Sequence, residues 1–463
     1  MNINDQTKRR DISPISGKRY RGEVKIQVFD ARTDKLVQEA HGHNMVTNAV
    51  RDIFASNYFG LMNYQNLLPI RDLFGGVLCF RDALTEDADS YYPPISSANP
   101  VTAHAGQGTN ITADSTRGYA NVALSYPVTN GFQFCWEFNT SQGNGKISSL
   151  ALTHKDTGDY WLNGGAAYEP IKNLDYPTGT GFLRQIECWD DDNRTAYGFE
   201  GNDTTLNLVE YKDYSSILGI GINEANLMTR PDSNVIVATH TYTLPRHWAL
   251  MKYLFLKTER QIHAIYPTGN KIERLIINLS DFTSSRSDIT LAAEVALKPY
   301  EAFTTTHSQV LQLDHDGFIY FQSSTNTKKY RIKYSSPSNV VDVTASAAFQ
   351  YEFFPFTGIG NYGLYVTGTN GIIIDGATAH DCGINSDNNS DNYVPRWRSP
   401  FRVGNSPVFY LPCSRRNEES LNYPRLALCK LYMATIKNLD EPVTKSSTNS
   451  MKITYTITEE EES

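Results

Sequence analysis

The residues best suited to chemistry in this sequence are three consecutive aspartates, Asp190, Asp191 and Asp192, which follow Trp189. Glycoside hydrolases place two carboxyl groups on either side of the scissile bond, so carboxylates beside an aromatic ring suggest a sugar-cleaving site. Adjacent residues of a strand point to opposite faces, however, which makes neighbouring aspartates poor partners. A turn before Asn193 is the simpler role for them.

Two other groups of aspartates carry the oxygen ligands that calcium prefers. Asp314 and Asp316 stand two residues apart before Gly317, and Asp387 and Asp391 lie in an Asn/Ser/Asp-rich run. An EF-hand loop needs further oxygen ligands and a glutamate at its twelfth position, and neither stretch provides them. We therefore predict a turn and a loop rather than a metal site, with these four aspartates as weak calcium candidates.

An aromatic side chain between two guanidinium groups forms the best candidate binding motif. Trp397 stands between Arg396 and Arg398, and Tyr393 precedes them. This combination suits stacking on a sugar ring or the centre of a protein interface. It also occurs where a tryptophan packs on the body of a protein under arginine stems. Both interpretations remain open, and these four residues are the candidate binding residues.

One glycine-rich pattern resembles a nucleotide-binding loop, GxGxxG over 358–363. In dinucleotide sites such a loop leads into a helix whose N-terminus holds the pyrophosphate. Here strand-like segments follow at 364–367 and 372–374, so the pattern predicts a turn. The sequence contains no HExxH or GxSxG motif and no credible Cys-His pair. We predict a non-enzyme that uses no cofactor.

The elements at the start of the chain are typical of a β-sandwich-like domain with one short helix. Residues 1–20 are charged and lack periodicity, which predicts a flexible basic arm. Alternating apolar residues predict a hairpin from strands over 23–29 and 36–40, and helical spacing predicts a helix over 49–59. We expect this domain to extend over 21–165.

Further strands of this domain come from two distant parts of the sequence. Alternating segments at 131–139 and 146–154 flank a Gly-rich loop and predict a hairpin. The polar stretch that includes 102–108 predicts a surface loop. The alternating run at the end of 431–458 needs a sheet to join, because an isolated two-stranded ribbon is marginal in water. We predict that it closes on the body and that 459–463 is a frayed acidic tail.

The middle of the chain, 190–430, consists of short strand-like segments in groups that recur after roughly forty to fifty residues. The segments 253–279 and 310–334 follow the same order of strand, turn and strand. This spacing favours the blades of a small β-propeller, while a multi-hairpin β domain with strands of the same length is the alternative. The fold class is therefore mainly β in both parts.

Composition excludes several function classes. The chain has 463 residues and 40% hydrophobic residues, with 28 tyrosines against 5 tryptophans, enough for packed domains rich in sheet. The formal net charge of −8 argues against nonspecific binding to nucleic acid. The six cysteines lack metal-ligand spacing, which predicts buried free thiols formed in a reducing cytoplasm. No apolar run is long enough for membrane insertion, and we expect no signal peptide.

The closing segment resembles a known family. Ala434–Lys445 and Met451–Glu459 are similar to the ends of tail-fibre and baseplate proteins of the receptor-binding type from tailed bacteriophages, especially those of Gram-positive hosts. The first hairpin with its following helix, and the segment 145–153, are weaker echoes of the same proteins. The resemblance covers roughly the last thirty residues of the chain.

This resemblance implies a structural protein of the virion, made in the host cytoplasm and located in the tail tip, baseplate or tail fibre. The resemblance implies that 21–165 is the virion-attachment domain. The implied partners are other copies of the chain, in a trimer, and neighbouring tail proteins. Two alternatives follow from the residues above: a receptor-binding protein that attaches to a host-surface glycan, and a polysaccharide depolymerase acting through Asp190 to Asp192.

Overall fold

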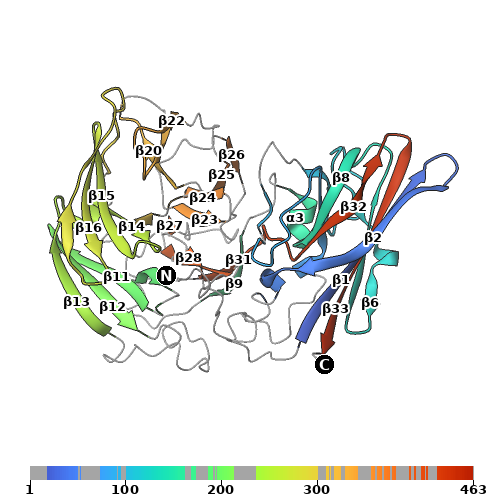
Figure 1. Ribbon diagram of the computed structural model, residues 1–463, viewed down its shortest axis with the longest axis horizontal. Helices are drawn as coiled ribbons and strands as arrows, with labels where there is room; N and C mark the ends of the chain where they lie inside the picture. Colours follow the sequence, from blue (N-terminus) through green and yellow to red (C-terminus); the bar gives the residue numbers. More distant parts are fainter. Residues whose placement is uncertain are drawn as a thin grey trace, which may run out of the picture.

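The computed structural model shows a mainly β protein with two β-rich domains, drawn at the right and left of Figure 1. The structure describes residues 18–50, 53, 73–90, 92–94, 101–161, 168–173, 186–190, 193, 195–212, 236–300, 309–311, 313, 317–324, 329–342, 356–359, 362–367, 370–375, 378–381, 396–397, 401–402, 408–411, 413–414 and 425–461.

A 10-stranded, nearly closed sheet forms the first domain, which we call the β-domain. Its strand order is β4-β3-β8-β32-β2-β1-β33-β7-β5, and β6 pairs with β7. The bounds are β1 Lys18–Asp30, β2 Leu36–Val46, β3 Gly76–Phe80, β4 Val101–Ala105, β5 Tyr119–Ala120, β6 Tyr126–Val128, β7 Gly131–Phe138, β8 Gly145–Thr153, β32 Thr435–Lys445 and β33 Asn449–Glu461, with helix α3 at Lys155–Asp159 and a 3-10 turn at Val122–Leu124. The two edges approach each other where His104 of β4 bridges Arg117, just before β5.

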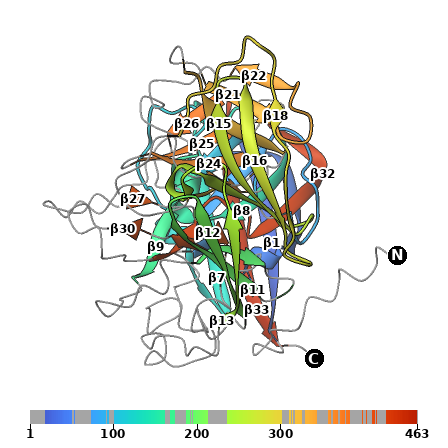
Figure 2. The same cartoon turned by 90° about the vertical axis from the view of Figure 1, so that its left-hand side faces the viewer.

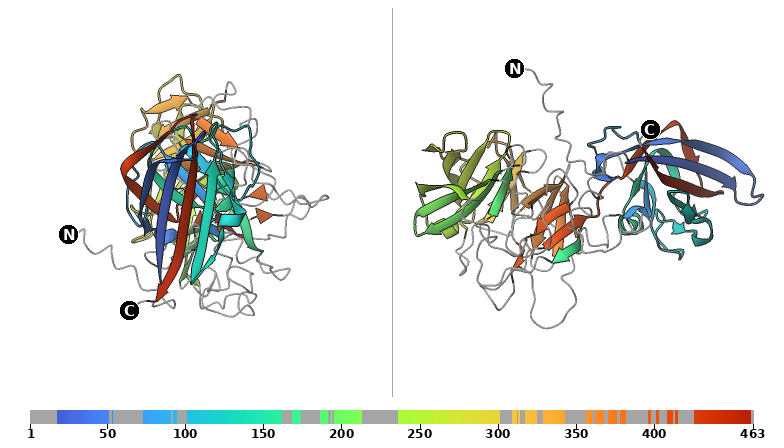
Figure 3. Two further views of the ribbon diagram at one scale, coloured as in Figure 1. Left: turned by 90° about the vertical axis from the view of Figure 1, so that its right-hand side faces the viewer. Right: turned by 90° about the horizontal axis from the view of Figure 1, so that it is seen from below.

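The C-terminal strands close the β-domain from within. Strand β33 lies between β1 and β7, and β32 lies between β2 and β8, as the red strands among blue and cyan ones show in Figure 3. Ile453 is fully buried and stands opposite Ile26 on one side and Trp136 on the other. The buried hydroxyl of Tyr455 hydrogen-bonds to Asn44 and Thr435, which ties β33 to β2 and β32. The predicted closure by the last strands is confirmed.

Residues 18–20 and 459–461, at the two ends of the described chain, are strand rather than tail. Strand β1 begins at Lys18 inside the predicted arm, and β33 continues to Glu461 inside the predicted acidic tail. Lys18 stands opposite Glu461 in the strand register, and the Tyr20 hydroxyl donates to Glu459 at 3.2 Å. The prediction of frayed ends was therefore wrong for 18–20 and 459–461.

The structure also differs from the predicted hairpin at 131–154 and from the predicted loop at 102–108. Strands β7 and β8 exist where they were expected, but they form no hairpin, because β7 pairs with β33 and β8 pairs with β32 and β3. Part of the expected loop 102–108 is strand β4, whose His104 and Ala105 are buried. The first hairpin is confirmed as β1 and β2. Residues 48–50 and 53 are helical, within or next to the predicted helix.

The second domain is propeller-like and is inserted into the β-domain between α3 and β32. Its antiparallel sheets follow one another along the chain and form a ring in Figure 1. Blade 1 is β10 Ile186–Asp190, β11 Thr195–Asn202, β12 Thr205–Lys212 and β13 Ile236–Thr243; blade 2 is β14 Lys252–Leu256, β15 Gln261–Thr268, β16 Lys271–Asn278 and β17 Ser284–Arg286, with β18 Ile289–Thr290 beside β16 and β19 Gln309–Leu311 parallel to β14. Blade 3 is β20 Phe318–Gln322, β21 Lys329–Lys333 and β22 Val340–Asp342; blade 4 is β23 Phe356–Ile359, β24 Tyr362–Thr367, β25 Asn370–Asp375 and β26 Thr378–Asp381.

The ring closes through its first and last strands. Blade 5 contains β28 Phe401–Arg402, β29 Val408–Leu411, β31 Arg425–Cys429 and, from the start of the insert, β9 Tyr168–Asn173. Pairing of β9 with β31 joins the beginning of the domain to its end, so the domain begins before the predicted residue 190. The GxGxxG stretch lies on β23 and β24, where Gly358 pairs with Gly363 in a hairpin, as predicted.

Consecutive blades pack face to face, because side chains along the strands of blade 2 point alternately to its two faces. Tyr253 belongs to the core shared with blade 1, whereas its neighbour Leu254 belongs to the core shared with blade 3. In a strand, successive side chains point to opposite faces, so each strand of this blade serves two cores. Figure 2 shows β15 and β16 of this blade facing the viewer.

Four cysteines are free and buried, as predicted: Cys79, Cys135, Cys188 and Cys429. Burial raises the pKa of the Cys79 thiol to about 12. The side chains of Cys382 and Cys413 lie outside the described part of the chain.

Candidate functional site

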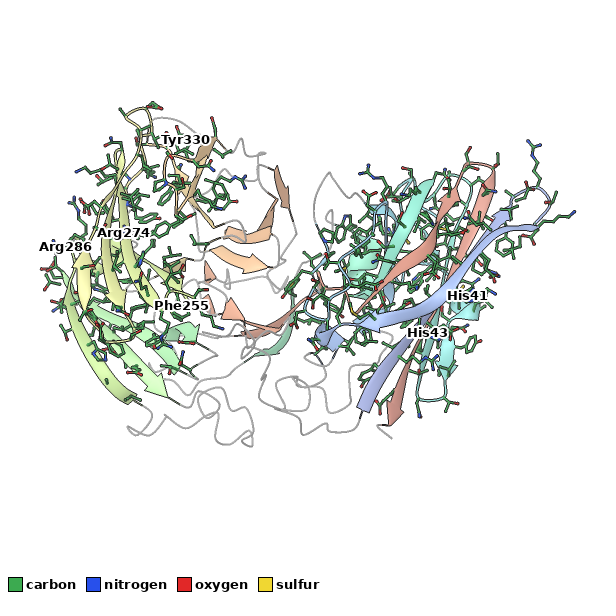
Figure 4. All side chains as sticks on the ribbon, in the orientation of Figure 1. His41, His43, Phe255, Arg274, Arg286 and Tyr330 are labelled. Atoms are coloured by element: carbon green, nitrogen blue, oxygen red, sulfur yellow. The ribbon has the colours of Figure 1, made fainter. Side chains whose placement is uncertain are left out.

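A polar pocket on the outer part of blade 2 is the candidate site, and we call it the arginine pocket. It has a volume of about 370 Å³, within the size range of small-molecule sites. Its walls come from the loop after β13, from β16, and from the end of β17; the lining residues are Pro245, Arg246, Glu273, Arg274, Arg286 and Asp288. Figure 4 labels Arg274 and Arg286 on this outer part of the blade.

Arg246 is fixed in the pocket by a bidentate ion pair. Its Nε donates to Glu273 Oε2 at 2.8 Å and its Nη2 donates to Glu273 Oε1 at 2.6 Å. The guanidinium also lies over the ring of Tyr266, 5.3 Å from its centre. These hydrogen bonds, together with the charges of Arg246, Lys271 and Arg286, lower the pKa of the Glu273 carboxyl. Glu273 is therefore ionised at neutral pH.

Strand pairing explains why Arg286 joins this group. Arg286 of β17 stands opposite Leu275 of β16, so its side chain shares a face with Glu273, two residues along β16. Arg286 Nη2 donates to the carbonyl oxygen of Thr243 at 3.4 Å. The carboxylate of Glu273 is thus surrounded by the cations of Arg246, Lys271 and Arg286.

Arg274 borders the pocket and is held by neutral acceptors. Its Nε donates to the carbonyl oxygen of Ser287 at 2.7 Å, and its Nη2 donates to Ser287 Oγ at 3.0 Å. Its guanidinium lies over the ring of Tyr334, 5.7 Å from the ring centre. These contacts connect the edge of blade 2 with blade 3.

Behind Arg274, a buried histidine links the two blades. His263 Nε2 lies 2.9 Å from Gln261 Oε1, and His263 Nδ1 lies 2.8 Å from the Tyr334 hydroxyl. Because the amide oxygen of Gln261 only accepts, Nε2 carries the proton and Nδ1 accepts from Tyr334. Burial and the charge of Arg274 lower the pKa of His263 to about 4. The imidazole is therefore neutral at pH 7 and supports Arg274 without adding charge.

The binding residues predicted from sequence lie mostly outside the described part. Arg396 and Trp397 form strand β27, which pairs with β30, Cys413–Ser414; their side chains, and all of Tyr393 and Arg398, are outside it. The calcium candidates Asp314, Asp316, Asp387 and Asp391 are outside it as well. Within the described ranges, no three His, Cys, Asp or Glu side chains are placed to hold a metal ion.

Of the three aspartates considered for the depolymerase alternative, only Asp190 has a described side chain, and that side chain has a structural role. It is 1% exposed. Its carboxylate accepts from Asn193 N at 3.3 Å, Asn193 Nδ2 at 2.8 Å and Arg260 Nη1 at 3.3 Å. This arrangement matches the predicted turn and adds a tie to blade 2 through Arg260. Asp191 and Asp192 lie outside the described residues.

Sequence reasoning missed the arginine pocket because its members are far apart along the chain. Arg246 precedes blade 2, Glu273 lies in its third strand, and Arg286 lies in its fourth. The available signal was the alternation Lys271-Ile-Glu273-Arg-Leu, which puts charges on one face of a strand. That signal identifies Lys271 and Glu273 as neighbours but not the arginines that approach from other segments.

Comparison with known proteins gives distant similarity only. No family model matches the chain, and no curated protein matches it significantly. Among solved structures, similar ones include an auxiliary nutrient binding protein from Bacteroides thetaiotaomicron (TM-score 0.29, 10% identity, 71% of this chain and 95% of that one) and a protein from Lactobacillus plantarum (TM-score 0.28, 8% identity, 63% and 74%). A streptogramin B lyase has a TM-score of 0.25 at 9% identity, over 62% of this chain and 96% of the other. At these TM-scores the likenesses indicate no function for this chain.

No helix within the described residues is long and apolar enough to cross a membrane.

Proposed function

We propose that this chain is a non-enzymatic structural protein of a tailed-bacteriophage virion, located in the tail tip, baseplate or tail fibre. In this role the β-domain docks on the particle, and the propeller-like domain faces outward toward neighbours or the cell surface. By resemblance, the host is a Gram-positive bacterium, and the chain acts in tail assembly and host attachment as a homotrimer.

The observation that carries this proposal is the insertion of one domain into the other. Strands β1 and β33 contain the two ends of the described chain and pair over thirteen positions, from Lys18 opposite Glu461 to Asp30 opposite Asn449. Two chain connections therefore hold the propeller-like domain to the β-domain, which serves as its base. Fraying at either end of the chain does not break these connections. This arrangement suits a particle component that presents a head, and the residues that resemble phage tail proteins lie in β32 and β33 of this base.

Exposed apolar side chains support a docking role for the β-domain. Val122, Leu124 and Tyr126 are 66%, 38% and 46% exposed and lie within one short segment beside β7. Clustered apolar residues at a surface are typical of a protein interface. They lie on the domain that we assign to the particle side.

Immunogold electron microscopy of phage particles whose genome encodes this chain tests the proposal. Antibodies against the purified chain should label one end of the tail, and labelling should be lost when the only copy carries Val122→Glu with Leu124→Glu. A matched variant, Leu36→Glu with Val37→Glu, changes two other exposed apolar side chains of the same domain, 49% and 57% exposed, and should keep the label. Absence of the chain from purified particles would contradict the virion role.

Two alternatives have different support. A receptor-binding protein for a host-surface glycan is favoured by the arginine pocket, which lies on the domain that we place outward. A polysaccharide depolymerase would need free carboxylates, yet Asp190 is engaged with Asn193 and Arg260. Release of reducing ends from host cell-wall polysaccharide by the purified chain would support the depolymerase and contradict a non-enzymatic role.

A further inference from the structure

The arginine pocket carries an excess of positive charge on an acidic chain. Four cations line it or act on its carboxylate, namely Arg246, Lys271, Arg274 and Arg286, against the two carboxylates Glu273 and Asp288. The chain as a whole has a formal net charge of −8. A local excess of one sign in a concave site concentrates ligands of the opposite sign.

The donors of this pocket are not all in use. Glu273 takes two N–H groups of Arg246, but Arg286 makes one long hydrogen bond, 3.4 Å to the carbonyl of Thr243. Among the described residues, no carboxylate forms an ion pair with the guanidinium of Arg274 or Arg286. An arginine has five N–H donors in a planar fork that matches a carboxylate or phosphate group. Arg286 therefore presents free donors beside a second, pre-positioned guanidinium.

We infer that the arginine pocket binds an oxyanion, a phosphate or carboxylate group on a small ligand such as a sugar derivative. Arg286 contacts the anion and Arg246 borders it. Glu273 holds Arg246 in position while it opposes the anion by its own charge, and Lys271 adds positive charge near that carboxylate. The volume of about 370 Å³ accommodates a ligand larger than the anionic group alone. This site is independent of the virion role and exists whether or not the chain is a tail protein.

Isothermal titration calorimetry of the full chain tests this inference, with inorganic phosphate, glucose 6-phosphate and glucuronate as probes at constant ionic strength. We expect saturable binding of at least one probe with a Kd of about 1 mM. Arg286→Gln should weaken it about tenfold, since hydrogen bonds to charged groups are the strong ones. Glu273→Gln should strengthen it, because the competing negative charge is removed while the amide oxygen of glutamine still accepts a hydrogen bond from Arg246. Arg81→Gln, an exposed arginine of the β-domain, is the matched control and should leave the Kd unchanged.

The calorimetry distinguishes a phosphate site, a carboxylate site and the absence of an anion site. Binding of the two phosphates alone identifies a phosphate site, and binding of glucuronate alone identifies a carboxylate site. The inference is overturned if no probe binds at ~10 mM, or if Arg81→Gln weakens binding as much as Arg286→Gln. It is also overturned if Glu273→Gln weakens binding while thermal unfolding shows that the variant is as stable as the native chain.

Discussion

Replacing Ile453 by alanine should loosen strands that are far from it in sequence. Ile453 is completely buried in β33, between Ile26 of β1 and Trp136 of β7. Truncation of a buried isoleucine removes apolar contacts and leaves a cavity, which costs about 3 kcal/mol. Thr456→Ala, on the outward face of the same strand between Glu23 and Gln133, should cost at most ~0.5 kcal/mol.

Hydrogen exchange of the full chain, followed by mass spectrometry, measures this effect segment by segment. A loss of about 3 kcal/mol lowers the protection of amides that open with β33 by about two orders of magnitude. We expect the loss in β1 and β7 as well as in β33, and unchanged exchange in β15 and β16 of blade 2. If Ile453→Ala affected residues 449–461 alone, or no more than Thr456→Ala did, β33 would not be an integral strand of the β-domain.

Three further perturbations test the packing. Arg260→Gln removes the cationic partner of buried Asp190 and should destabilise the propeller-like domain by about 1–2 kcal/mol in urea unfolding; no change would show that the pair is not formed. Burial lowers the pKa of His263 from 6.5 to about 4, so the unfolded chain binds a proton in this window that the folded chain does not. Stability should therefore fall by up to about 3 kcal/mol as pH drops from 6.5 to 4, and His263→Gln should reduce this slope; equal slopes would refute a neutral buried imidazole. A Cβ at Gly131 would lie 2.0 Å from the carbonyl oxygen of Ile457, so Gly131→Ala should lower the thermal midpoint and cost about 2 kcal/mol; an unchanged midpoint would mean that β7 and β33 are not closely paired there.

The alternation of apolar and polar residues was enough to predict strands, but it did not predict which strands pair. The run from Met451 to Ile457 was recognisable as a half-buried strand, and its need for a sheet led to the predicted closure. The turn between β7 and β8 has the composition of a hairpin loop, yet each strand pairs with a C-terminal strand instead. Local turn chemistry cannot reveal such partners, because they come from about three hundred residues further along.

The sequence also could not predict how the propeller-like domain closes or which residues form the arginine pocket. Pairing of β9 with β31 closes the ring across the whole insert, so no nearby residue indicates it. The charges at the two ends suggested solvated tails because the ends were considered separately, whereas the strand register sets Tyr20 opposite Glu459 and the two side chains form a hydrogen bond. Arg246, Glu273 and Arg286 likewise become neighbours only when blade 2 folds.

Electron cryomicroscopy of tail ends from the source particle would test the virion role most directly. We predict density for several copies of this chain, with each β-domain against neighbouring tail proteins through the surface of Val122 and Leu124, and each propeller-like domain outward. Particles that lack the chain, or that contact it through the propeller-like domain and leave the β-domain free, would contradict the proposed role.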